Sequence, residues 1–160
     1  MIDFRGIQNS DYSFLREMLY NAIFVPEGIP PLPKSIIDAP EISKYVEDWG
    51  KETDFGIIVE VDHKPIGAIW GRLLDEDHKG YGYIDSKTPE LSMAVEESYR
   101  GKGIGDKLLS IFLVRAKELG YKSISLSVDK RNKAFEFYKR MGFKIVSEQE
   151  TAYTMSWMRL

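Results

Sequence analysis

Apolar and polar positions along the 160-residue chain predict strands and helices in alternation. Runs rich in β-branched and aromatic residues predict strands at 2–7, 56–61, 65–73, 90–95 and 123–128, and a closing antiparallel pair at 143–146 and 153–159. Helices are expected over 10–25, 42–49, 104–119 and 131–141, each followed at once by a proline or a glycine. The three residues between 56–61 and 65–73 predict a hairpin with His63 at its tip.

The clearest of these elements is the helix after residue 103. Its apolar residues fall on one stripe, which comprises Ile104, Leu108, Ile111, Phe112 and Leu119. Residues 26–40 hold five prolines among apolar residues and predict an irregular loop that packs against the protein. Helices and strands alternate in the middle of the chain and strands adjoin at both ends. This order predicts an α/β fold with a mixed sheet and helices on both faces.

Composition then limits the function. The 22 Lys and Arg residues against 25 Asp and Glu give a net charge of -3, which provides no global field for nucleic acid. The chain has no cysteine, and its two histidines lack the spacing of metal ligands, so no metal is expected. No apolar run reaches the length of a signal peptide core or a membrane span. We therefore expect one domain over residues 1–160, located in the cytoplasm, with neither nucleic acid nor membrane as a partner.

Candidate chemistry lies in the glycine loop, which we define as residues 100–105. It consists of Arg100, Gly101, Lys102, Gly103, Ile104 and Gly105, between a predicted strand and the clearest helix. Glycines let successive N–H groups converge on an anion, and a helix start adds free donors and a partial positive charge. The spacing matches neither a Walker A loop nor a dinucleotide fingerprint. From the loop alone, a phosphate site and a tight structural turn are both open interpretations.

The residues around the loop resemble those of the GNAT superfamily of acyl-CoA-dependent N-acyltransferases. That family carries a strand, then Arg-x-x-Gly-x-Gly and a long helix, and this chain has 91–95 followed by Arg100, Gly103 and Gly105. A second family motif follows at the expected separation, as Asn132, Ala134, Phe137, Tyr138, Gly142 and Phe143. The resemblance covers residues 56–146 well. It implies a single-domain GNAT-like fold with a mostly antiparallel sheet of six to seven strands.

The resemblance also implies a binding site for acetyl-CoA. The pyrophosphate of coenzyme A would lie on the N–H groups of residues 100–105. The pantetheine arm would run beside Met93, Ala94 and Val95, on a strand that in the family diverges from its neighbour at 123–128. Asn132 would bond the pantetheine or the new amide, or cap the helix that follows it.

Two side chains are candidates for the proton transfers. Tyr138 is the candidate general acid, because a phenol with a pKa of about 10 stays protonated and can donate to a departing thiolate. It is equally a residue type expected in an aromatic core. Glu90 is the candidate general base for the acceptor amine, since partial desolvation at the start of its strand would raise its pKa. A solvated glutamate at a strand end is the alternative.

The sequence thus predicts an N-acetyltransferase that acts on a primary amine of a small molecule by direct attack in a ternary complex. A protein lysine or N-terminal acetyltransferase and a non-catalytic acyl-CoA sensor remain alternatives. The acceptor pocket is expected to involve Phe24, Glu27, Trp49, Trp70 and Arg72, although these residues would equally suit a core and a surface. A homodimer is possible through the C-terminal strand, which carries Tyr153, Trp157 and Met158.

Overall fold

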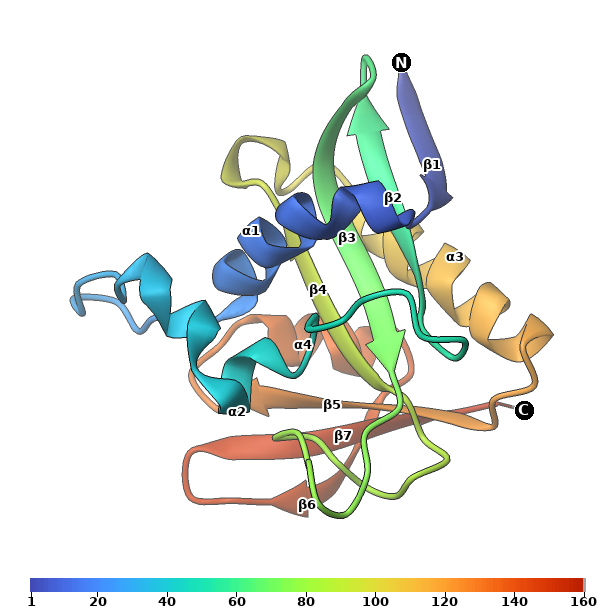
Figure 1. The fold of residues 1–160 in the computed structure, drawn as a ribbon. Coiled ribbons are helices and arrows are strands. Elements are labelled where there is room, and N and C mark those ends of the chain that lie inside the picture. Colours follow the sequence, from blue (N-terminus) through green and yellow to red (C-terminus); the bar gives the residue numbers. More distant parts are fainter. Residues whose placement is uncertain (160) are drawn as a thin grey trace.

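The computed structural model describes residues 1–159, in which seven strands form one sheet. Their order across the sheet is β1-β2-β3-β4-β5-β7-β6 (Figure 1). The strands are β1 (Ile2–Gly6), β2 (Phe55–Val61), β3 (Lys64–Arg72), β4 (Glu90–Val95), β5 (Ser123–Asp129), β6 (Lys144–Glu148) and β7 (Ala152–Met158). Each predicted strand is present and shifts by no more than two residues at either end.

The sheet is antiparallel except at its centre. Strands β4 and β5 are parallel, and within residues 1–159 they pair only at Glu90 and Ser125. Figure 1 shows the two strands diverging beyond that point. The mixed, mostly antiparallel sheet is therefore confirmed. Backbone groups along the side of β4 that faces β5 are left free of a strand partner, and such groups must bond to something else.

Helices cover both faces of the sheet, as predicted (Figure 1). One face carries α1 (Tyr12–Ala22) and α2 (Pro40–Ser43), and Leu15 and Met18 of α1 pack there in a cluster with Trp70. The other face carries α3 (Ile104–Glu118) and α4 (Ala134–Arg140), where the buried part of the apolar stripe joins a larger cluster with residues of β3 and β5. Leu119, also expected on that stripe, lies just after α3 and is exposed. Short 3-10 helices lie at Asn9–Asp11, Lys34–Asp38 and Glu97–Tyr99.

The second predicted helix is wrong in its position. A helix was expected over 42–49, whereas α2 starts at Pro40 and ends at Ser43. Proline suits the first helical position because its φ is fixed and its missing N–H is not needed there. Turns follow, and Asp48 has a φ of 55°. Residues 26–40, expected to be irregular, include the 3-10 helix Lys34–Asp38.

Two other helices differ from the predictions at one end. The first helix ends at Ala22 rather than at residue 25. The last begins at Ala134 rather than at residue 131, because the side-chain oxygen of Asn132 accepts a hydrogen bond from the N–H of Ala134 at 2.9 Å. Across residues 1–159 none of the helices combines the length and the apolar surface needed to cross a membrane.

Candidate functional site

The glycine loop joins the end of β4 to the start of α3, at the point where β4 and β5 have separated. Gly101 and Gly103 have φ angles of 75° and 80°, in the left-handed region that favours glycine. A Cβ on either residue would meet nothing within 4 Å, so backbone conformation rather than space requires glycine here. No side chain caps the start of α3 at Ile104, which leaves N–H donors of its first turn available.

The glycine loop itself carries two basic side chains, those of Arg100 and Lys102. The Nε of Arg100 donates a hydrogen bond to the carbonyl oxygen of Val95 at 2.8 Å and so ties the loop to the end of β4. The ammonium of Lys102 lies 5.6 Å from the centre of the Tyr99 ring. Both basic residues are exposed. Their charges and the helix start make this the favourable position for an anion.

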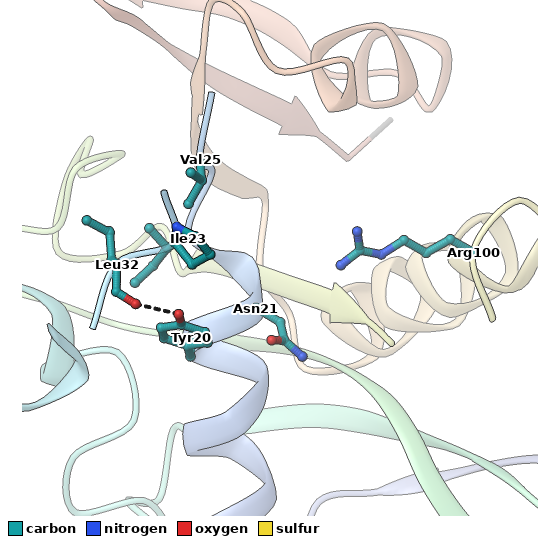
Figure 2. A pocket seen from close by; sticks show the side chains of 7 residues that line it. Tyr20, Asn21, Ile23, Val25, Leu32 and Arg100 are labelled. Atoms are coloured by element: carbon teal, nitrogen blue, oxygen red, sulfur yellow. Dashed lines mark hydrogen bonds between the residues drawn. The ribbon is translucent and has the colours of Figure 1, made fainter. Parts of the chain in front are cut away.

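A cavity of about 180 Å³ lies between the loop and the first helix (Figure 2). It is lined by Tyr20, Asn21, Ile23, Val25, Pro31, Leu32 and Arg100. The hydroxyl of Tyr20 donates to the carbonyl oxygen of Leu32 at 2.5 Å, which holds the segment after α1 against that helix. The volume is below the ~300 Å³ of pockets that enclose a drug-sized molecule. The cavity suits a narrow chain.

Strand β4 presents alternating residues to the two sides of the sheet. Ala94 is buried with the α1 cluster, whereas Val95 is buried and Met93 packs partly buried on the α3 side. The methyl carbon of Met93 would lie 3.3 Å from a Cβ on Gly105, so this glycine allows α3 to start close to β4. The predicted pantetheine residues thus lie beside the glycine loop and along the unpaired side of β4.

Helix α4 lies beside the start of α3. Arg140 pairs with Asp106 at 2.8 Å, and the ring of Phe137 lies 3.9 Å from a Cβ placed on Gly105. Tyr138 follows, its ring 5.6 Å from that of Phe143. Burial raises the pKa of Tyr138 to about 12. The phenol therefore stays protonated at neutral pH and can donate a hydrogen bond.

Glu90 is buried more completely than the sequence suggested, with 4% of its surface exposed. Its Oε2 accepts hydrogen bonds from the hydroxyl of Tyr45 at 2.6 Å and from the N–H of Gly82 at 3.1 Å. Burial raises the pKa of Glu90 to about 7, while the bonds from Tyr45 and Gly82 oppose that rise. The carboxyl group is therefore about half ionised at neutral pH, which suits a proton acceptor.

Tyr45, Gly80 and Gly82 were missed by sequence reasoning. A Cβ on Gly80 would come within 2.2 Å of Oε1 of Glu90, and a Cβ on Gly82 would come within 2.5 Å of the backbone of Leu126 in β5. These glycines let the segment before β4 lie directly on the carboxylate and on β5. Their only signal in the sequence was two glycines in an otherwise polar loop.

Several residues proposed for the acceptor pocket belong to the core instead. Trp70 is fully buried and its Nε1 donates to the carbonyl oxygen of Tyr45 at 2.9 Å. Arg72 pairs with Asp54 at 2.8 Å, both side chains being almost fully buried, and lies 5.5 Å from the Trp49 ring. The core alternative therefore holds for Trp70 and Arg72, while Trp49 is partly buried and packs against the core.

The remaining candidates are Phe24 and Glu27 for the acceptor pocket and three residues of β7 for a dimer interface. Glu27 is exposed, and the ring of Phe24 lies 5.8 Å from the guanidinium of Arg131. On β7, Tyr153 stacks with Phe135 and Trp157 is buried, while Met158 is exposed. Among residues 1–159 no group of three or more His, Cys, Asp and Glu side chains is placed to hold a metal ion.

Comparison with known proteins gives a consistent result. The model of the acetyltransferase (GNAT) family matches residues 18–143. A mycothiol acetyltransferase of Propionibacterium freudenreichii is 29% identical over 108 residues, which cover 66% of this chain and 32% of that protein. An uncharacterized N-acetyltransferase of Methanocaldococcus jannaschii is 37% identical over 113 residues, 69% of this chain and 46% of that protein. The chain spans less than half the length of these two relatives.

Solved structures show the same fold. The PaiA N-acetyltransferase of Thermoplasma acidophilum, crystallised in complex with coenzyme A, has a TM-score of 0.70 at 20% identity, with 99% of each chain covered. A putative acetyltransferase, YncA, from Salmonella typhimurium, with its cofactor acetyl-CoA, has a TM-score of 0.71 at 16% identity, covering 99% of this chain and 94% of that one.

Proposed function

Because the chain belongs to the acetyltransferase (GNAT) family, we propose that it transfers the acetyl group of acetyl-CoA to a primary amine of a small molecule. One observation carries the proposal. The glycine loop, the uncapped start of α3 and the unpaired side of β4 lie together towards the end of β4, beyond the point where β4 and β5 separate. Together they offer N–H groups for a pyrophosphate and backbone groups for an amide-containing arm.

The residues present fit the acyl donor. Gly101 and Gly103 have the backbone angles that an N–H cradle needs, and Arg100 and Lys102 add positive charge beside it. The pantetheine arm would lie along Met93, Ala94 and Val95 and reach the narrow cavity opposite Arg100. The side-chain oxygen of Asn132, just before the N-cap Lys133, accepts from the N–H of Ala134, which favours a structural role for Asn132. Bound acetyl-CoA would supply the activated acyl group.

Glu90 and Tyr138 would handle the protons. An alkylammonium has a pKa of about 10.4, so its proton must leave before the nitrogen can attack. Glu90 would accept that proton through a water molecule, because Tyr45 and Gly82 enclose the carboxylate. The amine nitrogen then bonds to the acyl carbon and the carbon–sulfur bond breaks. Tyr138 would donate a hydrogen bond to the departing thiolate. The chain has no cysteine, so an acyl-cysteine intermediate cannot form and the amine would attack the acyl carbon directly.

A small acceptor is favoured over a protein. The segment after α1 is held to that helix by the bond from Tyr20 to Leu32 and lies opposite Arg100 across a cavity of only about 180 Å³. A lysine or N-terminal peptide would need an open groove at this position. The segment containing Gly80 and Gly82 further encloses the side of the sheet on which Glu90 lies.

The test measures coenzyme A thiol released from acetyl-CoA in the presence of polyamines, aminoglycosides, amino acids and lysine peptides. We expect turnover with one class of small amine. Turnover only with peptides would favour the protein acceptor. Acetyl-CoA binding by calorimetry without turnover on any amine would favour a sensor, and absence of binding would refute the donor assignment.

Glu90→Gln tests the base with the best amine of that panel. A general base contributes about 10²–10⁴-fold, so we expect kcat to fall at least about 100-fold at pH 7. The loss should shrink towards pH 9.4, because the neutral fraction of a free alkylamine rises about 200-fold over that range. A loss that is the same at every pH would place the base elsewhere.

A further inference from the structure

The hydrogen bonds around Glu90 distinguish its two oxygen atoms. Oε2 accepts from the Tyr45 hydroxyl and the Gly82 N–H, and the Tyr45 oxygen itself accepts from the N–H of Tyr81 at 2.7 Å. Oε1 has no hydrogen-bond partner although it is buried. The carboxylate is therefore held through one oxygen and presents the other.

A second buried side-chain oxygen, that of Ser125, also lacks a hydrogen-bond partner. Within residues 1–159 only two buried side-chain polar atoms lack a partner, Oε1 of Glu90 and Oγ of Ser125. Their residues are in register at the single point where β4 and β5 pair, so both side chains project from the same face of the sheet. Buried polar groups are rarely left without a partner, and two of them at one point indicate a site for a hydrogen-bonding guest.

Gly80 lets the backbone of its segment lie directly against this buried oxygen. A Cβ at residue 80 would come within 2.2 Å of Oε1 and 2.5 Å of the Tyr45 oxygen. Any side chain there would compete with whatever Oε1 binds. The carboxylate oxygen thus lies against a backbone without a side chain, and Ser125, in register with Glu90, projects from the same face of the sheet.

Tyr45 is itself held in place by β3. Its carbonyl oxygen accepts from Nε1 of Trp70 at 2.9 Å, and Arg72 donates to the carbonyl oxygens of Lys44 and Glu47 in the same turn. Arg72 is also the register partner of Glu90 across β3 and β4. The turn that carries Tyr45 is therefore bonded to the strand beside the carboxylate.

We propose that Tyr45 is a positioning residue that occupies Oε2 of Glu90 and makes Oε1, on the face of the sheet that also carries Ser125, the oxygen that accepts the proton of the acceptor amine. The proposal rests on the proposed role of Glu90 as base. It goes further by naming the reacting oxygen, the residue that selects it and the serine in register with Glu90.

The charged surroundings of Glu90 fix the direction of the expected effect. Lys44 favours the ionised carboxylate from the same turn as Tyr45, and Arg72 lies in register beside it but is neutralised by Asp54. The hydrogen bond from Tyr45 also favours ionisation and so lowers the pKa of Glu90 against the effect of burial. Removing the hydroxyl must raise that pKa, and the acidic limb of the rate profile must move to higher pH.

The experiment measures kcat against pH for the full chain and for Tyr45→Phe, with the best amine of the panel. We expect the acidic limb to move up by about one pH unit, which is about a tenfold loss of rate below it, and the rate at high pH to stay within about threefold. The KM for acetyl-CoA should not change. Tyr121→Phe is the matched control, because Tyr121 stacks on Phe55, in the cluster on the α3 side of the sheet, and should leave the limb in place.

A limb that stays in place in a folded Tyr45→Phe protein would overturn the proposal, whatever its effect on stability. Ser125→Ala gives an independent test if Tyr45→Phe does not fold. We expect a lower kcat with an unmoved limb and an unchanged KM for acetyl-CoA, and an unchanged kcat would overturn the assignment of Oε1. If Glu90→Gln loses activity while both variants behave as wild type, the base stands and only this inference fails.

Discussion

Breaking the buried ion pair between Arg72 and Asp54 should strongly destabilise this domain. The exposed fractions of the two side chains are 3% and 2%. Arg72 donates to both oxygens of Asp54, at 3.1 and 2.8 Å, and to two carbonyl oxygens of the turn after α2. Asp54 also accepts from the N–H groups of Gly50 and Lys51. One carboxylate therefore joins β3 to the chain before β2.

Asp54→Ala leaves the guanidinium charge buried and two of its donors without a partner. Removing one member of a buried pair costs about 3–5 kcal/mol, because the desolvated charge that remains has no compensation. Domains of this size have a total free energy of unfolding of about 5–15 kcal/mol. A loss of about 4 kcal/mol therefore corresponds to a Tm lower by about 8–16 °C.

The measurement is chemical and thermal unfolding followed by circular dichroism. Asp38→Ala is the matched control, since Arg16 and Asp38 also pair at 2.6 Å but their side chains are 31% and 64% exposed. Solvent screens such a pair, and its loss should cost less than about 1 kcal/mol. Equal effects of the two substitutions would refute the argument from burial.

Two further predictions concern the proposed site. Gly103→Ala should weaken acetyl-CoA binding at least about tenfold in calorimetry. Gly120→Ala is the control, because Gly120 has a similar φ of 88° and equal open space, and it should lose similar stability without losing affinity for acetyl-CoA. Equal losses of affinity in the two variants would show that backbone strain alone causes the loss and would refute a binding role for the loop. Tyr138→Phe should lower kcat about 10- to 100-fold by removing the donor to the thiolate, with an unchanged KM for acetyl-CoA, and a kcat equal to that of Tyr121→Phe would remove Tyr138 from the chemistry.

Local patterns predicted the elements well where the chain is regular. The β-rich run at 90–95 coincides with β4, and the apolar stripe located α3. The helix expected over 42–49 was wrong because its turn is bonded by Arg72, a residue nearly thirty positions away. Propensity describes neighbours in sequence and does not include such a partner.

The candidate site also has a part that the sequence predicted and a part that only the fold brings together. The glycine loop and the motif around Tyr138 were found from sequence because their residues are contiguous and their conformational needs are local. Glu90 was found as a candidate, but its enclosure was not. Tyr45, Gly82 and Ser125 come from three separate segments and meet the carboxylate only in the folded chain.

By itself the sequence determined the order of strands and helices, the family resemblance and the position of the glycine loop, because residue type restricts backbone angles and the pattern of apolar residues reflects their burial. Only the tertiary structure decided that β4 and β5 separate after Glu90 and Ser125, and that a phenol and a glycine N–H occupy one oxygen of Glu90. Desolvation depends on everything packed around a group, so the proton affinity of Glu90 is a property of the fold.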